Sequence, residues 1–263
     1  MLNGSPLGTI ADPPAIHLQA AALTYDGKAL FKALDLALPA GQTTCLLGPS
    51  GVGKSSLLRL IAGLADGADG VALDERGAAL DGRIAYMAQQ DLLLPWLPLL
   101  ANVMLGPRLR GEARDPRLLE RARALIDEVG LTAHADKRPA QLSGGMRQRA
   151  ALARTLLEDR PIVLMDEPFA ALDAITRYEL QALAARLLQG RTVLLVTHDP
   201  LEALRLGHRV QVMAGRPASL DSPLEPPGSP PRALDDPALL GLQSELLRRL
   251  ADARQGLGEE PCA

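Results

Sequence analysis

GPSGVGKS, residues 48–55, stands between the apolar run TTCLL and the helix-like run SSLLRLIAGL. A buried strand, a glycine-rich turn and a helix, in this order, are the context in which the pattern G-x-x-x-x-G-K-[ST] binds phosphate. Glycines let backbone N–H groups curl around phosphate oxygens, and the helix N-terminus directs its positive end at the same anion. We therefore expect a nucleotide-binding loop made of Gly48, Pro49, Ser50, Gly51, Gly53, Lys54, Ser55 and Ser56.

Two side chains of this loop carry specific chemistry. Lys54 adds a positive point charge beside the phosphates, and the Ser55 hydroxyl can bind Mg²⁺. The plain alternative, an ordinary glycine-rich turn, leaves the strand before the loop and the helix after it unexplained. The loop alone establishes only that a nucleotide binds.

A second apolar run, PIVLMDEP at 161–168, ends in two carboxylates. At the end of a buried strand, Asp166 can hold Mg²⁺ through water, while Glu167 points to the other side and can polarise an attacking water molecule. Pro168 ends the strand. An Asp-Glu pair in this place is otherwise a solvated strand end, but beside a phosphate-binding loop it predicts a metal site and a general base.

QLSGGMRQR, residues 141–149, places a serine and two adjacent glycines before a run that is typical of a helix. Ser143 offers a hydroxyl, Gly144 and Gly145 offer bare backbone N–H groups, and the helix N-terminus offers the positive end of its dipole. Because one loop already surrounds the phosphates, we expect this second anion site to serve a nucleotide held by another subunit. The alternative is a flexible helix start.

Apolar runs alternate with helix-like stretches along the chain, which predicts a mostly parallel α/β sheet. The runs expected to form strands are 16–23, 33–38, TTCLLG, RIAYMA, PIVLM and TVLLVT. An α-helical insert is expected at about 91–160, with its clearest helices at 116–129 and 146–157. The expected divisions are a disordered N-terminal segment (1–15), an α/β domain (16–215), a Pro-rich linker (216–236) and a C-terminal helix and tail (237–263).

The final helix carries its own signals. Asp236 can cap it, with Pro237 in the first helical position. One face is apolar and is expected to dock on the domain; it contains Leu239, Leu242, Leu246 and Leu250.

Composition restricts the class of protein. The 263 residues are 47% hydrophobic, enough for a sizeable core, and the formal net charge of -3 gives no general attraction to nucleic acid or an anionic membrane surface. No run approaches the roughly 18 apolar residues of a membrane span, and the start lacks the basic and apolar regions of a signal peptide. Cys45 and Cys262 indicate neither a disulfide framework nor a zinc site, which fits a reducing cytoplasm.

Taken together and in this order, the motifs resemble those of the ATP-binding cassette (ABC) ATPases, whose signature is similar to LSGGMRQR at 142–149. The resemblance covers about 16–215. It implies a P-loop NTPase of the α/β class, with a RecA-like core, an antiparallel β portion and an α-helical subdomain, and it implies ATP and Mg²⁺ as cofactors. One departure is Met146, which stands where the commonest signature has glutamine and cannot make that polar contact.

The resemblance adds four residues to the site. It implies that Tyr25 stacks on adenine, that Gln89 senses Mg²⁺ or the attacking water, and that His198 lies near the γ-phosphate. Asp173, in the sequence ALD at 171–173, resembles the D-loop. Taken singly, these residues read as a packed strand-end aromatic, a surface amide, a satisfied strand-end histidine and a helix N-cap; the order and spacing of the motifs favour the functional roles.

Two copies of such a subunit are expected to face each other head to tail. ATP bound by Lys54 of one copy would then be closed over by Ser143 of the other, and Glu167 would direct water at the γ-phosphate. Hydrolysis would loosen this sandwich and move whatever is attached.

The attached protein is expected to be an integral membrane permease, because transport needs membrane helices that this sequence lacks. The resemblance implies that the chain is cytoplasmic and lies on the inner face of the cell membrane. It also implies that the chain works indirectly with a periplasmic or surface solute-binding protein and has no nucleic-acid partner. DLLLPWLPLL, residues 91–100, reads either as part of the insert's core or as a groove for a coupling helix of the permease. QDLLLPWL with LSGGMRQR is similar to importers of the nitrate, sulfonate and taurine group, and MAQQDLLLPWL resembles the branch that imports hydroxymethylpyrimidine.

Two other classes of protein compete with this interpretation. A soluble cassette ATPase acting on nucleic acid or in translation would usually need two cassettes, a long coiled-coil insertion or basic arms, which the sequence does not show. A P-loop kinase or GTPase would lack the signature and the histidine at 198. The motifs therefore favour a bacterial importer ATPase.

Overall fold

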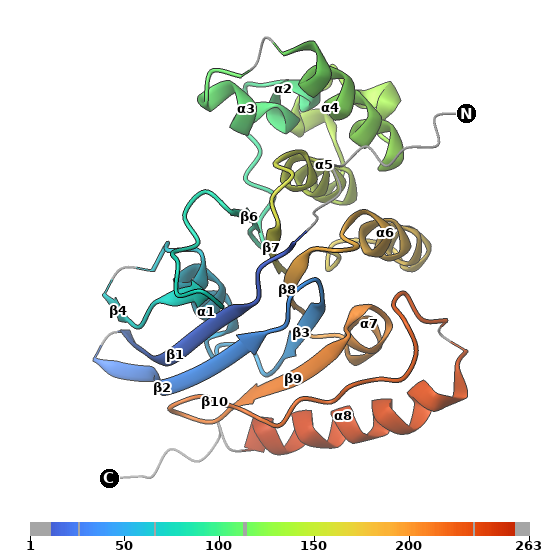
Figure 1. Cartoon of the computed structure of the whole chain (residues 1–263). Helices are drawn as coiled ribbons and strands as arrows, with labels where there is room; N and C mark the ends of the chain where they lie inside the picture. Colours follow the sequence, from blue (N-terminus) through green and yellow to red (C-terminus); the bar gives the residue numbers. More distant parts are fainter. Residues whose placement is uncertain (1–11, 26, 66, 113–114, 234, 256–263) are drawn as a thin grey trace.

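The computed structural model describes residues 12–25, 27–65, 67–112, 115–233 and 235–255. The strand order of its central sheet is β10 (Ser219–Leu220), β9 (Arg209–Ala214), β3 (Thr43–Leu47), β8 (Thr192–Val196), β7 (Ile162–Asp166) and β6 (Ile84–Met87). All neighbours pair in parallel except β10, which is antiparallel to β9. β7 and β8 are buried along their whole length because other layers cover both faces of the sheet (Figure 1). The predicted parallel α/β sheet is confirmed.

A smaller antiparallel sheet lies beside the central one (Figure 1). It contains β2 (Lys28–Leu38), β1 (Ile16–Tyr25) and β4 (Ala68–Asp69), with β5 (Ala72–Asp74) also paired to β1. Its apolar side chains share one core with α1 (Lys54–Ile61) and with one face of β7 and β8. The antiparallel β portion implied by the resemblance is therefore present, and it packs around the helix that follows the phosphate-binding loop.

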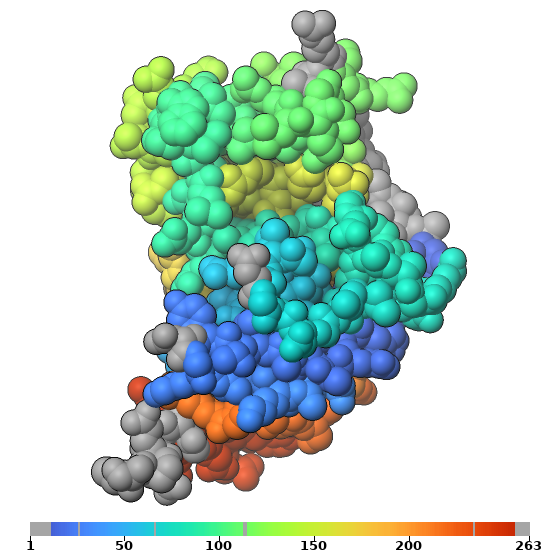
Figure 2. All heavy atoms as spheres, turned by 90° about the vertical axis from the view of Figure 1, so that its left-hand side faces the viewer, coloured from blue at the N-terminus to red at the C-terminus, as the bar shows by residue number. Residues whose placement is uncertain are grey.

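The interval expected as a helical insert is helical. It contains α2 (Leu99–Val103), α3 (Leu105–Leu109), α4 (Pro116–Glu128), the 3-10 turns η1 (Thr132–His134) and η2 (Pro139–Gln141), and α5 (Gly144–Leu157). Figure 2 shows this subdomain, in green to yellow, as the upper layer above the cyan and blue part of the chain. α5 contacts both α2 and α4 and also β6, so it joins the subdomain to the central sheet.

Short polar side chains fix where several helices begin. Ser143 caps α5, and Asp115 caps α4, each by accepting from a backbone N–H of the first turn. Asp173 and Asp199 do the same for α6 (Ala174–Leu187) and α7 (Pro200–Leu206). The starts of α5, α6 and α7 carry the candidate site segments, so local sequence places these segments at helix N-termini.

The Pro-rich segment 216–236 was expected to be a linker, and the structure corrects this. The segment contains β10, and Arg232 within it is only 5% exposed. Its guanidinium donates to the carbonyls of Leu204 and Gly207 at the end of α7, and also to carbonyls of residues 226–228. Because helix C-terminal carbonyls carry partial negative charge, they stabilise a buried cation. The segment is thereby attached to the domain.

The C-terminal helix follows the sequence-based expectation. α8 runs over Pro237–Gln255, and the Asp236 carboxylate accepts from the N–H of Ala238. On its inner face Leu239 and Leu246 are buried, and the flanking Leu242 and Leu250 pack partly buried against the same core. α8 thus docks on α7 and β9 (Figure 1).

The N-terminal segment 1–15 was expected to be disordered, and residues 1–11 of it lie outside the described residues. Pro14, however, is buried, and its carbonyl accepts a 2.7 Å hydrogen bond from the Thr192 hydroxyl. The expectation is therefore wrong for the end of this segment. Within the described ranges, no helix combines the length and the apolar character needed to cross a bilayer.

Candidate active site

The phosphate-binding loop connects β3 to α1 at the carboxyl edge of the central sheet. Gly48, Gly51 and Gly53 have φ values of 153°, 78° and 112°, which side chains disfavour. A Cβ on Gly48 would lie 2.5 Å from the carbonyl oxygen of Met213 on the neighbouring strand. The loop therefore needs glycine both for its conformation and for the close approach of β9. The remaining predicted loop residues lie on this turn or in the first turn of α1; they are Pro49, Ser50, Lys54, Ser55 and Ser56.

The Lys54 side chain folds over the loop. Its Nζ donates to the carbonyl oxygens of Gly48 at 2.7 Å and Pro49 at 2.9 Å, and the residue is 8% exposed. Burial lowers the pKa of Lys54, while the charges of Glu167 and Asp166 act in the opposite sense. The ammonium group thus lies at the loop with two carboxylates nearby, where it can meet an incoming phosphate.

Ser55 and Asp166, both predicted to bind Mg²⁺, are in direct contact. The Ser55 hydroxyl donates to the Asp166 carboxylate, and this bond opposes the rise in the pKa of Asp166 that burial causes. A hydroxyl beside a carboxylate supplies the oxygen ligands that Mg²⁺ prefers, so these residues fit the ion. Among the described residues no group of three or more His, Cys, Asp and Glu side chains could hold a metal. Mg²⁺ here would take its other ligands from Gln89, nucleotide and water.

Glu167 brings together the three residues predicted to be catalytic. Its Oε2 accepts from Nε2 of Gln89 at 3.3 Å and lies 3.3 Å from Nδ1 of His198. The side chain of His198 is 63% exposed and that of Glu167 is 19% exposed. A carboxylate partly shielded from water, next to an exposed imidazole and an amide, can accept a proton from a water molecule in the open part of the site.

The backbone of Glu167 is held in an unusual conformation. Its φ is 48°, a left-handed value that is uncommon for residues other than glycine, and its N–H donates to the carbonyl of Val196 on β8 at 2.9 Å. From α5, the buried Gln148 amide donates to the carbonyl of Pro168 at 3.1 Å. Sequence reasoning missed Gln148; a polar residue on the inner side of the helix after SGG is the signal that could have found it.

The signature residues lie at the start of α5. Ser143 is its N-cap, with Oγ accepting from the N–H of Met146 at 3.2 Å, and Gly144 and Gly145 are its first two residues. Ser143 and Gly144 are exposed, whereas Met146 packs against the core of the helical subdomain. The side chain at 146 therefore makes apolar contacts within this chain.

Asp173 and Tyr25, implied by the resemblance to belong to the site, lie at the start of α6 and the end of β1. Asp173 caps α6 through a 3.0 Å bond from the N–H of Thr176, and these hydrogen bonds lower its pKa. Its N-cap role is thus observed, and a D-loop role is compatible with its exposure. Tyr25 ends β1 and is 74% exposed, so its ring is available for stacking.

Two arginines of α5 hold the segment after Gln89, and sequence reasoning missed both. Arg147 forms an ion pair with Asp91 at 3.0 Å, and Arg154 donates to the backbone carbonyls of Asp91 and Leu92. Since α5 begins with the signature, these bonds connect the signature helix to the Gln89 segment.

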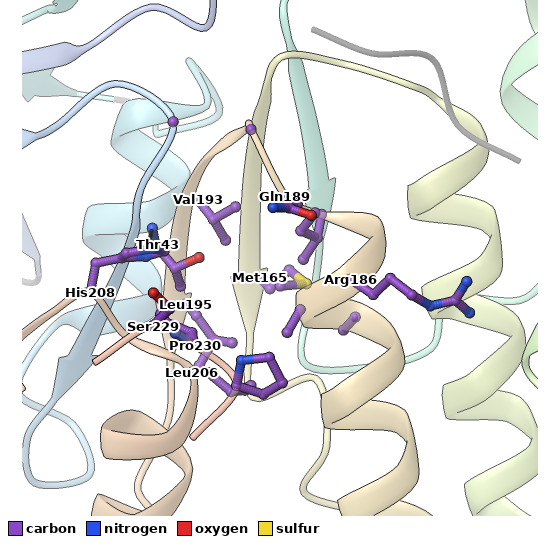
Figure 3. A pocket seen from close by; sticks show the side chains of 16 residues that line it. Thr43, Met165, Arg186, Gln189, Val193, Leu195, Leu206, His208, Ser229 and Pro230 are labelled. Carbon is purple, nitrogen blue, oxygen red and sulfur yellow. Dashed lines mark hydrogen bonds between the residues drawn. The ribbon is translucent and has the colours of Figure 1, made fainter. Parts of the chain in front are cut away.

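A separate cavity of about 340 Å³ lies between α6, the starts of β3 and β8, and residues 229–231 (Figure 3). Its lining includes Thr43, Met165 and His208, whose Nδ1 accepts from the N–H of Thr43. Burial lowers the pKa of His208, and the charge of Arg232 acts in the same sense. None of the predicted site residues lines this cavity, so it is distinct from the nucleotide site.

Comparisons with known proteins agree with this geometry. The family profile described as ABC transporter matches residues 31–170. A protein of Haemophilus influenzae named uncharacterized ABC transporter ATP-binding protein is 43% identical over 89% of this chain and 98% of its own length. Aliphatic sulfonates import ATP-binding protein SsuB 1 of Rhodococcus jostii is 45% identical over 85% of this chain and 88% of its own length. The solved dimeric structure of a bacterial ABC transporter cassette is 30% identical, with a TM-score of 0.71, and covers 81% of this chain and 100% of that one.

Proposed function

This chain belongs to the ABC transporter family of ATP-binding proteins and is the ATPase subunit of a bacterial importer, and we propose that the residues gathered at Glu167 hydrolyse ATP to drive uptake of aliphatic sulfonates or similar small solutes. The observation that carries the proposal is the contact of Glu167 with both Gln89 and His198, at the end of the strand that also supplies Asp166.

In the proposed reaction, water attacks the γ-phosphorus of ATP while Glu167 accepts a proton from that water. The bond from the γ-phosphorus to its bridging oxygen breaks and leaves ADP and inorganic phosphate. Lys54 and the loop N–H groups bind the phosphates, and His198 donates to the γ-phosphate. Ser55, Asp166 and Gln89 would hold Mg²⁺, which, when bound, neutralises negative charge on the phosphate oxygens.

The second nucleotide-binding surface is proposed to act on a partner copy. Ser143 and Gly144 are exposed at a helix N-terminus, which is suited to an anion that arrives from outside the chain. In a head-to-tail dimer, Ser143 of one copy would close over the ATP bound by Lys54 of the other. Dimeric cassettes of 30% identity support this arrangement.

The segment after Gln89 is proposed to dock on a membrane permease. Trp96 is 64% exposed and Leu92 is 58% exposed, although both belong to an ordered segment. The buried Asn102 fixes this segment: its amide accepts from the N–H of Leu94 and donates to the carbonyls of Leu94 and Leu97. Large apolar side chains held rigidly in water are typical of a binding surface.

The transported solute is assigned by similarity. Relatives from two genera, including one from Burkholderia lata that is 41% identical over 96% of this chain, are named aliphatic sulfonates import ATP-binding proteins. We propose sulfonates ahead of hydroxymethylpyrimidine on this basis. A periplasmic or surface solute-binding protein would supply the solute, and the ATPase would be peripheral on the inner face of the cell membrane. Action on nucleic acid is the competing function, and the net charge of -3 does not favour it.

Purification of the tagged chain from detergent-solubilised membranes of its own cells tests the proposal. We expect a multi-span membrane protein and a solute-binding protein to co-purify. The ligand released from the solute-binding protein should be identified by mass spectrometry as an aliphatic sulfonate. Recovery of a pyrimidine would change the solute, and recovery of only nucleic acid or non-membrane proteins would overturn the transport role while leaving the ATPase intact.

A further inference from the structure

A layer of polar side chains lies buried between α6 and α7, directly behind the candidate site. Gln181 on α6 and Glu202 and Arg205 on α7 are each 5% exposed or less. The Arg205 guanidinium stacks on the Tyr178 ring, 3.7 Å from its centroid, and donates to the Tyr178 carbonyl. Burying a carboxyl group costs free energy unless hydrogen bonds or charges compensate, and apolar side chains could join two helices without it. The reaction described above does not use this layer.

The hydrogen bonds of the layer lead toward residue 198. Arg205 donates to Oε1 of Gln181 at 2.7 Å, so the Gln181 amide nitrogen is oriented to donate to Glu202 Oε2, at 2.9 Å. The Glu202 carboxylate also accepts from the Thr197 hydroxyl. The oxygen of that hydroxyl in turn accepts from the backbone N–H of Asp199 at 3.1 Å.

Thr197 and Asp199 are the chain neighbours of His198. By holding the Thr197 hydroxyl, Glu202 restrains the backbone on both sides of His198 and therefore the direction in which the imidazole reaches Glu167. One small hollow is lined by Glu202, Thr197, His198 and Glu167 together. Glu202 is thus a buried residue that contacts the candidate site through Thr197.

The same carboxylate faces the residue that holds the D-loop segment. Arg177 on α6 donates to the carbonyl of Phe169 at 3.3 Å and to that of Leu172 at 2.8 Å. Arg177 also lines the small hollow, and its charge favours the ionised form of Glu202. Glu202 therefore lies between the segment that carries His198 and the turn that precedes Asp173.

We propose that Glu202 is a positioning residue for hydrolysis: as a carboxylate it holds Thr197 and Gln181 and attracts Arg177, and it thereby ties the His198 segment to the D-loop segment. The proposal rests on the role of His198 proposed above.

The groups that face Glu202 are Arg177 from α6, Asp199 from the start of α7, and the thiol of Cys45 from β3. Burial raises the pKa of Glu202 to about 7, while the bonds from Thr197 and Gln181 oppose the rise. Burial raises the pKa of Cys45 as well, so this thiol is neutral. Protonation turns one oxygen of Glu202 into a donor, so the acid form loses one of its two accepted hydrogen bonds.

The test compares kcat of the wild-type chain and of Glu202→Gln across pH. Glutamine has the shape and hydrogen-bonding pattern of the protonated acid. At about pH 8.5 we expect wild-type kcat to exceed that of the variant about tenfold, because a tenfold ratio corresponds to the loss of about one charge-assisted hydrogen bond. At about pH 6 the ratio of the two kcat values should approach one. KM for ATP should stay within about twofold, since no group bound to the nucleotide is changed. A ratio that is the same at both pH values would overturn the proposal.

Two further variants make the result specific. Thr197→Val keeps the shape of the side chain and removes the hydroxyl; it should lower kcat, and adding Glu202→Gln should then cause a smaller loss than it causes in the wild-type chain. If the losses in kcat of the two single variants simply added in the double variant, the proposal would also be contradicted. Glu179→Gln, an exposed change on α6, should leave kcat and its pH profile unchanged. Glu167→Gln is measured in parallel: if it hydrolyses ATP normally, the proposed function fails, whereas normal behaviour of the Glu202 variant alone overturns only this inference.

Discussion

Nδ1 of His198 lies 3.3 Å from Oε2 of Glu167, and the two residues follow the ends of the neighbouring parallel strands β8 and β7. Parallel pairing puts both strand ends at the same edge of the sheet, although 30 residues separate them in sequence. Gln89, after β6, reaches the same carboxylate oxygen because β6 is the next strand in the sheet. The hydrogen-bonding centre of the site is thus a consequence of strand order.

Glu167→Gln should preserve ATP binding and cut turnover by roughly 10² to 10⁴, because an amide cannot accept a proton from water. Without hydrolysis the ATP-bound dimer should persist. Phosphate release and light scattering with ATP measure the two effects, and the Glu179→Gln variant serves as the control. Unchanged turnover would remove Glu167 from the role of base.

Ser143→Arg should abolish turnover and leave ATP binding by the monomer nearly intact. The bulky cation would block the surface that meets the partner's nucleotide, while Lys54 and its own loop are unaltered. Fluorescent-nucleotide titration at low protein concentration checks the binding. Loss of binding by the monomer would contradict the head-to-tail geometry.

Gly48→Ala and Gly51→Ala should differ in stability. An added Cβ at Gly48 meets the Met213 carbonyl, whereas at Gly51 it meets open space and only the left-handed φ opposes it. We expect a loss of about 1 kcal/mol for Gly51→Ala and clearly more for Gly48→Ala. Urea unfolding of the nucleotide-free protein measures both. Equal losses would mean that the strand moves to accommodate the methyl group.

Trp96→Ala should weaken assembly with the permease and leave the ATPase of the isolated chain unchanged, since Trp96 is exposed and forms no part of the hydrolysis site. Loss of a buried interface tryptophan typically costs about 2 kcal/mol or more of binding free energy. Leu240→Ala is the matched control, because Leu240 is similarly exposed, at 59%, on α8. Co-purification from membranes compares the two; equal retention would place the permease elsewhere.

Rising pH should destabilise the folded chain through Glu202. Burial raises the pKa of this carboxyl group from 4.5 in the unfolded chain to about 7 in the folded one, so between these values only the unfolded state loses its proton. The contribution of Glu202 to the free energy of unfolding is fully present below pH 4.5 and is lost as the pH rises to 7. The loss is on the order of 3 kcal/mol. Urea unfolding at acidic and alkaline pH should show the decline in wild type and a smaller one in Glu202→Gln. Parallel declines would mean that the buried carboxyl does not control it.

Elements that depend on local rules could be predicted from the amino-acid sequence. Glycine spacing at 48–53 and the strand and helix around it fixed the phosphate-binding loop, and Ser143 and Asp236 marked helix starts correctly because capping acts within three residues. Buried apolar runs predicted β3, β6, β7 and β8. β9 was missed because Gln211 interrupts its apolar residues. The Pro-rich segment looked like a linker because composition cannot show that Arg232 is buried against α7.

Which of these residues meet depends on how the distant segments of the chain pack together. Glu167 contacts Gln89 and His198 through strand order, and Gln148 reaches the turn at Pro168 from another helix. Glu202 has no role in the motifs of the sequence; packing against α6 removes it from water, and this burial raises its pKa. Local sequence sets the conformation of each segment, whereas burial and contacts between distant segments set its chemistry, because both depend on where the rest of the chain packs.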